Sequence, residues 1–318
     1  MSTAEQVLRR PVAAEHDYSV SLEYIREKAK RKKWRTSIHA WVLLFPSLIF
    51  LGIFTVYPIV QSAFSSLYKD DLTTITPVFS GLENYRALAL DPIFRECIRN
   101  NLLIAVVTVP ASIALGVAMA SFSHSLGKKG KTITRIGFIY PTFIPLVAAA
   151  NIWMFIYTPI YGLLGYINPE WRLLANGRTA IWAIIVMLIW KQAGYLMLFY
   201  IAGLNGISRE VFEAAELDGA CGFQKFRTIT WPLLKPTTMY VFIIALTSAF
   251  KTVDHLYIMT KGGPGNATNM LLFYIYQTGF DYWNNGKASA MTVILVGLLL
   301  IITAVKFFYD DRKAYYND

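Results

Sequence analysis

The sequence predicts an all-α membrane protein with six transmembrane helices. Of its 318 residues, 55% are hydrophobic and only 16% are charged, whereas soluble domains carry about 25% charged residues. A helix needs about 20 apolar residues to cross the hydrocarbon core of a bilayer. Six segments reach this length, at residues 39–67, 101–122, 133–157, 179–203, 236–259 and 288–309.

A polar and basic tail, residues 1–36, precedes the first of these segments. The apolar run from Ile38 to Tyr57 is longer than the core of a secretory signal peptide, which has about 7–15 residues. We therefore interpret it as a retained span, and we divide the chain into the tail and a transmembrane domain, residues 37–318. The tail either lies along the membrane surface through its basic residues or has no fixed structure.

The placement of Lys and Arg predicts the orientation of the spans. Seven basic residues lie between positions 26 and 35, three lysines lie in the loop 123–132, and four more basic residues lie in the loop 204–235. Because cytoplasmic loops are enriched in Lys and Arg, both termini and the 204–235 loop are expected on the cytoplasmic side. The net charge of +10 is then a signature of topology and not of nucleic-acid binding.

The 204–235 loop is expected to form a compact pair of short helices. Ser208 is a suitable N-cap for a helix that starts near Arg209, and Gly219 can end that helix in a left-handed conformation. A second short helix is expected at about 223–229, with Pro232 stopping its continuation. The small residues Ala214 and Ala215 would let a partner backbone approach, so the loop suits docking into a groove.

The order of residues in this loop resembles the EAA loop of permeases from binding-protein-dependent ABC importers. The residues that carry the resemblance are Glu213, Ala214, Ala215, Asp218, Gly219, Ile229 and Pro232. It implies a type I ABC importer permease fold, in a bacterial inner membrane, whose cytoplasmic EAA coupling helix docks on an ATPase subunit. The implied partners are a second, homologous permease, two ABC ATPase subunits and a periplasmic or lipid-anchored solute-binding protein. One departure is Trp231, where the family usually has Leu.

Two other stretches resemble the carbohydrate-uptake, or maltose-type, group of these permeases. One is the turn 260–264, with its Gly-Gly-Pro sequence, and the other is the outer segment 81–85 followed by Asn100 and Asn101. This resemblance covers about residues 80–310 and implies a sugar or a sugar-like solute.

Polar residues within the fourth and fifth spans are candidates for the solute path. An ionisable side chain in a span costs about 2.5–3.5 kcal/mol, so it normally faces a cavity or a partner. The candidates are Lys191, Gln192, Tyr195, Lys251, Thr252, Asp254 and Tyr257. Lys251 and Asp254 are three positions apart, so they either neutralise each other on one helical face or line the path. If the two lysines line the path, they favour an anionic solute, such as an oligouronate or a glycerophosphate; if they are structural, the solute can be neutral.

The sequence contains no motif for catalysis, metal binding or a cofactor. Its four histidines do not have metal-ligand spacing, and the segment 125–132 ends in Gly-Lys-Thr but has Ser125 where a phosphate-binding loop needs its first glycine. We therefore expect a transport subunit that is not an enzyme and relies on ATP hydrolysis by its partners. The alternative is an ion-coupled secondary transporter that uses Asp254 and His255 as a proton relay.

Overall fold

The computed structural model describes residues 34, 37, 40–251 and 253–311. Nearly all of the predicted tail 1–36 lies outside these residues. The chain forms two compact units, which divide between Gln61 and Ser62. An apolar helix begins in the first unit at Ala40 and contains a wider π-helical turn, η1 (Gly52–Val56). It continues as α2 (Tyr57–Ser65), whose last four residues belong to the second unit. The π turn ends shortly before Pro58, whose ring nitrogen has no hydrogen to donate to the helix.

The second unit contains the remaining candidate spans. Three are largely continuous helices, α4 (Pro92–Ser125), α8 (Gly177–Asn205) and α15 (Asn285–Asp311). The fifth candidate span, Lys235–Met259, consists of α12 (Lys235–Lys251) and α13 (Asp254–Met259). Within the described residues, five helices are long and apolar enough to cross a membrane, or six when one bent pair is counted as a span.

The bent pair corresponds to the predicted third span. α5 (Lys128–Phe143) and α6 (Leu146–Tyr157) meet at an angle of 100°, so the expectation of one helix over 133–157 is wrong in this detail. Ile144 is extended and precedes Pro145. A residue before proline avoids the helical conformation because the proline ring clashes with its backbone, which explains the break.

Helix α8 is the central element of the second unit, and small residues let its neighbours come close. A Cβ atom added to Gly116 of α4 would lie 3.2 Å from the Cβ atom of Leu196, and one added to Gly194 of α8 would lie 2.3 Å from the carbonyl oxygen of Phe138 in α5. Close packing through small residues is how transmembrane helices associate in the absence of a hydrophobic driving force.

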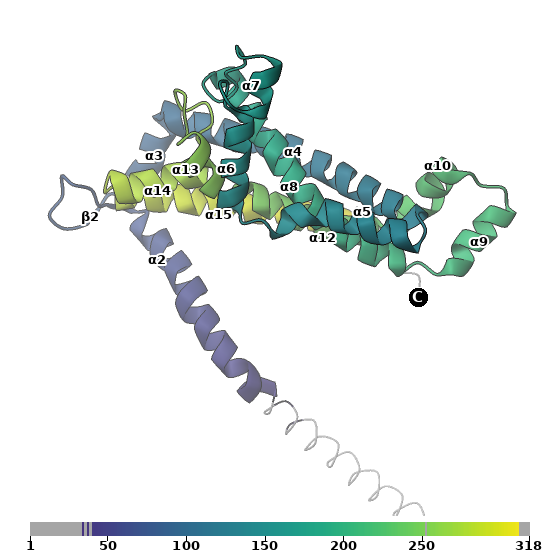
Figure 1. Cartoon of the computed structure of the whole chain (residues 1–318). Helices are drawn as coiled ribbons and strands as arrows, with labels where there is room; N and C mark the ends of the chain where they lie inside the picture. The colour runs from purple at the N-terminus through teal and green to yellow at the C-terminus, as the bar shows by residue number, and fades with distance from the viewer. Residues whose placement is uncertain (1–33, 35–36, 38–39, 252, 312–318) are drawn as a thin grey trace, which may run out of the picture. The chain divides into compact units, whose positions relative to one another are not determined.

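The short elements gather at the two ends of the second unit. The loop helices α9 (Arg209–Leu217) and α10 (Gly222–Lys225) lie at one end, and α3 (Glu83–Leu90) and α14 (Leu271–Tyr276) lie at the opposite end (Figure 1). That opposite end also includes an antiparallel pair of two-residue strands, with Tyr68 opposite Phe79. The remaining short elements of the unit are β1 (Tyr68–Lys69), β2 (Val78–Phe79), α7 (Leu163–Ile167), η2 (Phe226–Thr230), α11 (Trp231–Leu233) and η3 (Gln277–Asp281).

The stretches that resemble maltose-type permeases meet at this opposite end. Asn100 donates side-chain hydrogen bonds to the carbonyl oxygens of Asn266 (3.1 Å) and Asn269 (2.9 Å), and the side-chain oxygen of Asn101 accepts one from the backbone N–H of Leu271 (2.7 Å). The start of α4 is thereby joined to the loop that follows the Gly-Gly-Pro turn. These two asparagines satisfy backbone groups that would otherwise be buried without partners.

A single carboxylate joins three further segments there. The side chain of Asp91 caps α4 by accepting hydrogen bonds from the backbone N–H groups of Ile93 (2.8 Å) and Phe94 (3.3 Å). Its other oxygen accepts from the Tyr274 hydroxyl (2.7 Å) and from Lys287 Nζ (2.6 Å). Burial alone would raise the pKa of Asp91, but the hydrogen bonds from Lys287 and Tyr274 and the charge of Lys287 hold that pKa below its usual value.

Candidate functional site

The 204–235 loop folds into two short arms. Its first arm is α9, preceded by Ser208 in the extended conformation of an N-cap residue, although this serine side chain makes no capping hydrogen bond. Gly219 has φ +75°, and the N–H of Ala220 bonds to the carbonyl oxygen of Ala215 at 3.0 Å. The predicted left-handed end of the first helix is therefore present, and it turns the chain into the second arm.

The second arm is longer than predicted. It runs from α10 through the π turn η2 into α11, with the N–H of Trp231 bonded to the carbonyl oxygen of Phe226. The prediction that Pro232 stops this helix is wrong, because Pro232 lies in the first turn of α11. Thr230 and Trp231 before it are already helical, so its missing N–H falls within the helical run, directly after the turn that the π geometry has widened.

Ion pairs hold the loop in shape. Glu213 pairs with Arg209 one turn earlier in α9 at 2.8 Å, and Glu216 of the first arm pairs with Lys225 of the second arm at 2.7 Å. The hydrogen bond from Lys225, reinforced by its charge, lowers the pKa of Glu216. The second pair links the two arms. It could not be predicted from sequence spacing, because its partners lie on different helices.

The two arms enclose a hollow of about 440 Å³. Four of the seven residues predicted for coupling line it, and Glu213, Gly219 and Pro232 do not. The lining residues are Val211, Ala214, Ala215, Asp218, Ala220, Gln224, Thr228 and Ile229. The small side chains of Ala214 and Ala220 leave the hollow open.

A second cavity, here called the polar cavity, lies between the spans and has a volume of about 300 Å³. It brings together the three candidates from the fourth predicted span with polar residues from three other helices that sequence reasoning missed. The full lining is Thr108, Thr142, Leu146, Leu188, Lys191, Gln192, Tyr195, Ser248 and Ala249. The missed hydroxyl residues, Thr108, Thr142 and Ser248, are single small polar residues in apolar helices, and such residues carry little signal in a sequence.

Two of the polar groups in this cavity also bind the backbone of neighbouring helices. Lys191 Nζ donates to the carbonyl oxygens of Pro141 (3.3 Å) and Ile144, which lie at the break between α5 and α6. Helix ends leave carbonyl oxygens without intrahelical partners, and a cation there also complements the helix dipole. Gln192 donates to the carbonyl oxygen of Ala245 in α12 at 3.3 Å. Lys191 thus acts as a clamp, in that it binds the backbone at the break in the third span, and it also lines the cavity.

The candidates from the fifth predicted span do not line the polar cavity, and Thr252 lies outside the described residues. The expectation that Lys251 and Asp254 share one helical face is wrong, because α12 ends at Lys251 and Val253 is non-helical (φ −123°, ψ −16°). Both side chains are exposed, and within the described residues they form no ion pair with each other. Tyr257 is also exposed, at 54%.

The proton relay of the alternative function is not assembled in the described part of the chain. His255 is fully buried, and neither ring nitrogen has a hydrogen-bond partner there, whereas the neighbouring Asp254 is exposed. Among the described residues, no group of three or more His, Cys, Asp or Glu side chains could hold a metal ion.

Comparisons with known proteins place these features in one family. The sequence model of the "Binding-protein-dependent transport system inner membrane component" matches residues 112–314. The chain is 31% identical to the sn-glycerol-3-phosphate transport system permease protein UgpA of Agrobacterium fabrum, over 87% of this chain and 96% of the relative. It is 35% identical to the sulfoquinovosyl glycerol transport system permease protein SmoG of the same species, over 84% of this chain and 88% of the relative.

Solved structures agree on the fold. A bacterial ABC transporter involved in the import of the acidic polysaccharide alginate contains a chain that matches with a TM-score of 0.77 and 20% identity, over 89% of this chain and 99% of that chain. The predicted fold class and the resemblance to ABC importer permeases are confirmed. With the family model covering most of the second unit and relatives above 30% identity along nearly their whole length, the chain belongs to the inner membrane components of binding-protein-dependent transport systems.

Proposed function

We propose that this chain is the permease subunit of an ATP-driven importer for an anionic, sugar-like solute delivered by a solute-binding protein. The single observation that carries the transport part of the proposal is the polar cavity, where Lys191, Gln192, Tyr195 and Ser248 from α8 and α12 meet between spans. Amides and hydroxyls can bond to sugar hydroxyls, and the Tyr195 ring offers a face for stacking.

The relatives support the anionic character of the solute. Their names give sn-glycerol-3-phosphate, sulfoquinovosyl glycerol and the acidic polysaccharide alginate as solutes, and phosphate, sulfo and acidic sugar groups are all anions at neutral pH. In this chain the cationic candidates are Lys191, which is half-buried and already bonded to two carbonyl oxygens, and Lys251, which is exposed. Lys251 is therefore the group available to meet an arriving anion.

The 204–235 loop supports coupling to ATPase subunits. Its hollow is lined by Ala214, Ala215, Asp218 and Ile229, and its two arms are exposed at one end of the second unit (Figure 1). The proposed complex contains this chain, a second homologous permease, two ATPase subunits and a binding protein. ATP would close the ATPase dimer, and the loops of both permeases would move with it as the spans change from inward-facing to outward-facing. The coupling acts only through the difference in its free energy between those two states.

The proposed orientation places the loop and both termini in the cytoplasm. The 123–132 loop has three lysines and the 204–235 loop has four basic residues. The two loops lie at the same end of the second unit, because the rings of His124 and Phe212 are 6.1 Å apart. The positive-inside rule assigns that end to the cytoplasm.

The test of the solute is the ATPase activity of the complex, co-expressed with its partners and reconstituted with the binding protein. We expect glycerophosphates or uronate oligosaccharides to stimulate hydrolysis and neutral oligosaccharides to fail. Lys251→Met is expected to lower the stimulation by an anion about fivefold, because one opposite charge at an exposed position is worth about 1 kcal/mol. Lys129→Met, at an exposed cytoplasmic lysine, is the matched control and should keep full stimulation.

Stimulation by neutral sugar alone would remove the anionic part of the proposal and leave the importer part. The failure of any ATPase subunit to associate with the chain would overturn the coupling itself.

A further inference from the structure

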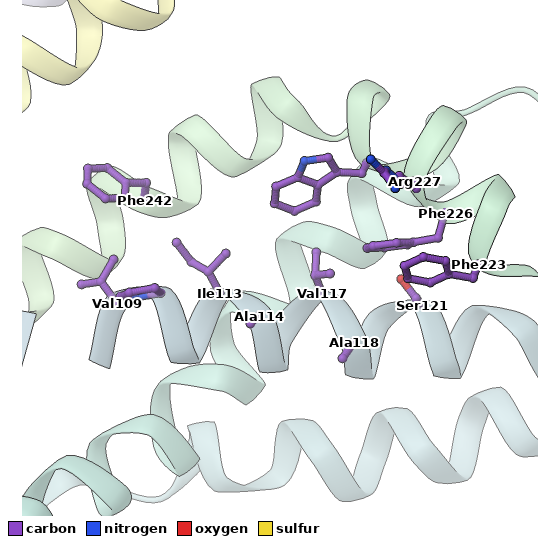
Figure 2. A pocket seen from close by; sticks show the side chains of 12 residues that line it. Val109, Ile113, Ala114, Val117, Ala118, Ser121, Phe223, Phe226, Arg227 and Phe242 are labelled. Carbon is purple, nitrogen blue, oxygen red and sulfur yellow. The ribbon is translucent and has the colours of Figure 1, made fainter. Parts of the chain in front are cut away.

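A long apolar groove on the membrane part of the second unit is not used by the proposed transport mechanism. It lies between α4, Phe242 of α12 and the second arm of the 204–235 loop, and its volume is about 760 Å³. Figure 2 shows Val109 and Phe242 at one end of this α4–α12 groove, and Ser121, Phe223, Phe226 and Arg227 at the other. The full lining is Val109, Pro110, Ile113, Ala114, Val117, Ala118, Ser121, Phe223, Phe226, Arg227, Trp231 and Phe242.

The length of the groove fits one leaflet of a bilayer. Its wall on α4 runs from Val109 to Ser121, which corresponds to about 18 Å of helix at about 1.5 Å per residue. Half of the hydrocarbon core of a bilayer is about 15 Å thick. All lining side chains except Ser121 and Arg227 are apolar or aromatic, so an extended hydrocarbon chain is the chemical match for the groove.

Charge is present at one end of the groove only. Arg227 is exposed and, in the described part of the chain, forms no ion pair. The neighbouring lining residue Trp231 belongs to a residue type that gathers at the membrane–water interface. The groove therefore combines a cation at the interface with an apolar surface as long as one leaflet. An anionic amphiphile has the matching charge and the matching apolar chain.

We propose that the α4–α12 groove is a binding site for an anionic glycerophospholipid of the leaflet on the side of the 204–235 loop. One acyl chain would lie along Ile113, Val117 and Phe242, and the phosphate would meet Arg227. Under the orientation proposed above, this is the cytoplasmic leaflet, whose anionic lipids attract basic residues close to the surface. The lipid would pack directly against the second arm of the loop, so the loop would rest partly on lipid.

The test places a photoreactive diazirine side chain at Ala118, inside the groove, and at Val106, an exposed position of α4 outside it. The full chain, with the subunits that co-purify with it, is reconstituted in nanodiscs of equal parts phosphatidylglycerol and phosphatidylcholine. Adducts are identified by mass. At Ala118 we expect phosphatidylglycerol adducts to exceed phosphatidylcholine adducts about fivefold, the factor that corresponds to about 1 kcal/mol for one cation near the surface. At Val106 the adducts should follow the equal composition of the disc.

Two substitutions then separate the groove from general attraction to a basic surface. Arg227→Gln, combined with the Ala118 probe, is expected to remove the preference for phosphatidylglycerol. Lys129→Gln, at another exposed cation of the same end, should leave it unchanged. Equal adducts of the two lipids at Ala118 would overturn the proposal, and so would an adduct with the sister permease or with another segment of this chain. None of these readouts depends on transport or on the identity of the solute.

Discussion

The 204–235 loop and the polar cavity represent two different ways of building a proposed functional surface. In the loop, the residues that matter lie within 30 positions of one another, and local backbone geometry places them, above all the left-handed turn at Gly219. In the cavity, the lining comes from α4, α5, α6, α8 and α12, and Lys191 binds carbonyl oxygens about 50 positions earlier in the chain. The first surface is therefore sensitive to changes in backbone conformation, and the second to changes in helix packing.

The largest expected effect comes from Gly219→Val. At φ +75° a β-branched residue costs about 1–2 kcal/mol or more of backbone strain, so the turn between the two arms will change shape. We expect solute-stimulated ATPase activity and uptake to fall by at least tenfold while the chain still inserts into membranes. The matched control is Gly127→Val in the other loop of the same end, where φ is −67° and there is open space around the Cα atom.

The next effect is that of Glu213→Lys. It replaces the ion pair with Arg209 by two like charges one helical turn apart, which costs only about 0.5 kcal/mol within the helix. We nevertheless expect uptake to fall several-fold, because Glu213 is exposed at the surface proposed to dock on the ATPase. The double change Arg209→Glu with Glu213→Arg separates the two roles. If this swap restored uptake, Glu213 would matter only through its pair with Arg209.

Lys191→Met tests the cavity and should act on stability as well as on transport. It leaves the carbonyl oxygen of Ile144 without its donor, whereas the carbonyl oxygen of Pro141 keeps the hydrogen bond from the backbone N–H of Ile144. A half-buried unsatisfied acceptor costs on the order of 1–2 kcal/mol. We expect a lower thermal unfolding midpoint in detergent and reduced stimulation by every solute, anionic or neutral. The same measurements on Lys251→Met should show an unchanged midpoint. An unchanged midpoint for Lys191→Met would contradict the role of Lys191 as a clamp.

The smallest effect is expected from the pair that links the two arms. Lys225 lowers the pKa of Glu216 from its usual value of 4.5, so the pair is fully present above about pH 4.5 and is lost as the pH falls through the lowered pKa. Glu216→Gln should mimic that loss at neutral pH. The measurement is hydrogen exchange of the backbone amides of residues 213–225, which should become modestly faster, with the exchange of α8 as the internal reference.

The same contrast explains what the sequence could predict. The spans, the first arm and its end at Gly219 follow from local patterns of apolar length, capping and glycine. The break between α5 and α6 was also marked locally, by Pro145, although we predicted a single helix there. The interruption at Val253 could not be predicted in this way, because no glycine or proline lies beside it. The length of the second arm could not be predicted either, because it depends on the π turn that precedes Pro232.

The site residues divide in the same way. Ala214, Ala215, Asp218 and Ile229 were predicted from one short stretch, and they line one hollow. Lys191, Gln192 and Tyr195 were predicted as polar residues in a span. The other polar residues of the lining, Thr108, Thr142 and Ser248, depend on which helix faces meet. Side-chain contacts across four helices are properties of packing and are not encoded in the spacing of any one segment.

The carboxylate of Asp91 has a consequence for how the spans can move. It accepts four hydrogen bonds, two from the first turn of α4, one from Tyr274 and one from Lys287 in the first turn of α15. One carboxylate therefore holds three chain segments together. Any rearrangement that parts these helix ends must break charge-assisted bonds to a partly buried anion, which are stronger than neutral ones. Helices fastened together at one tip pivot about that tip, so the largest displacements belong to their far ends, beside the 204–235 loop.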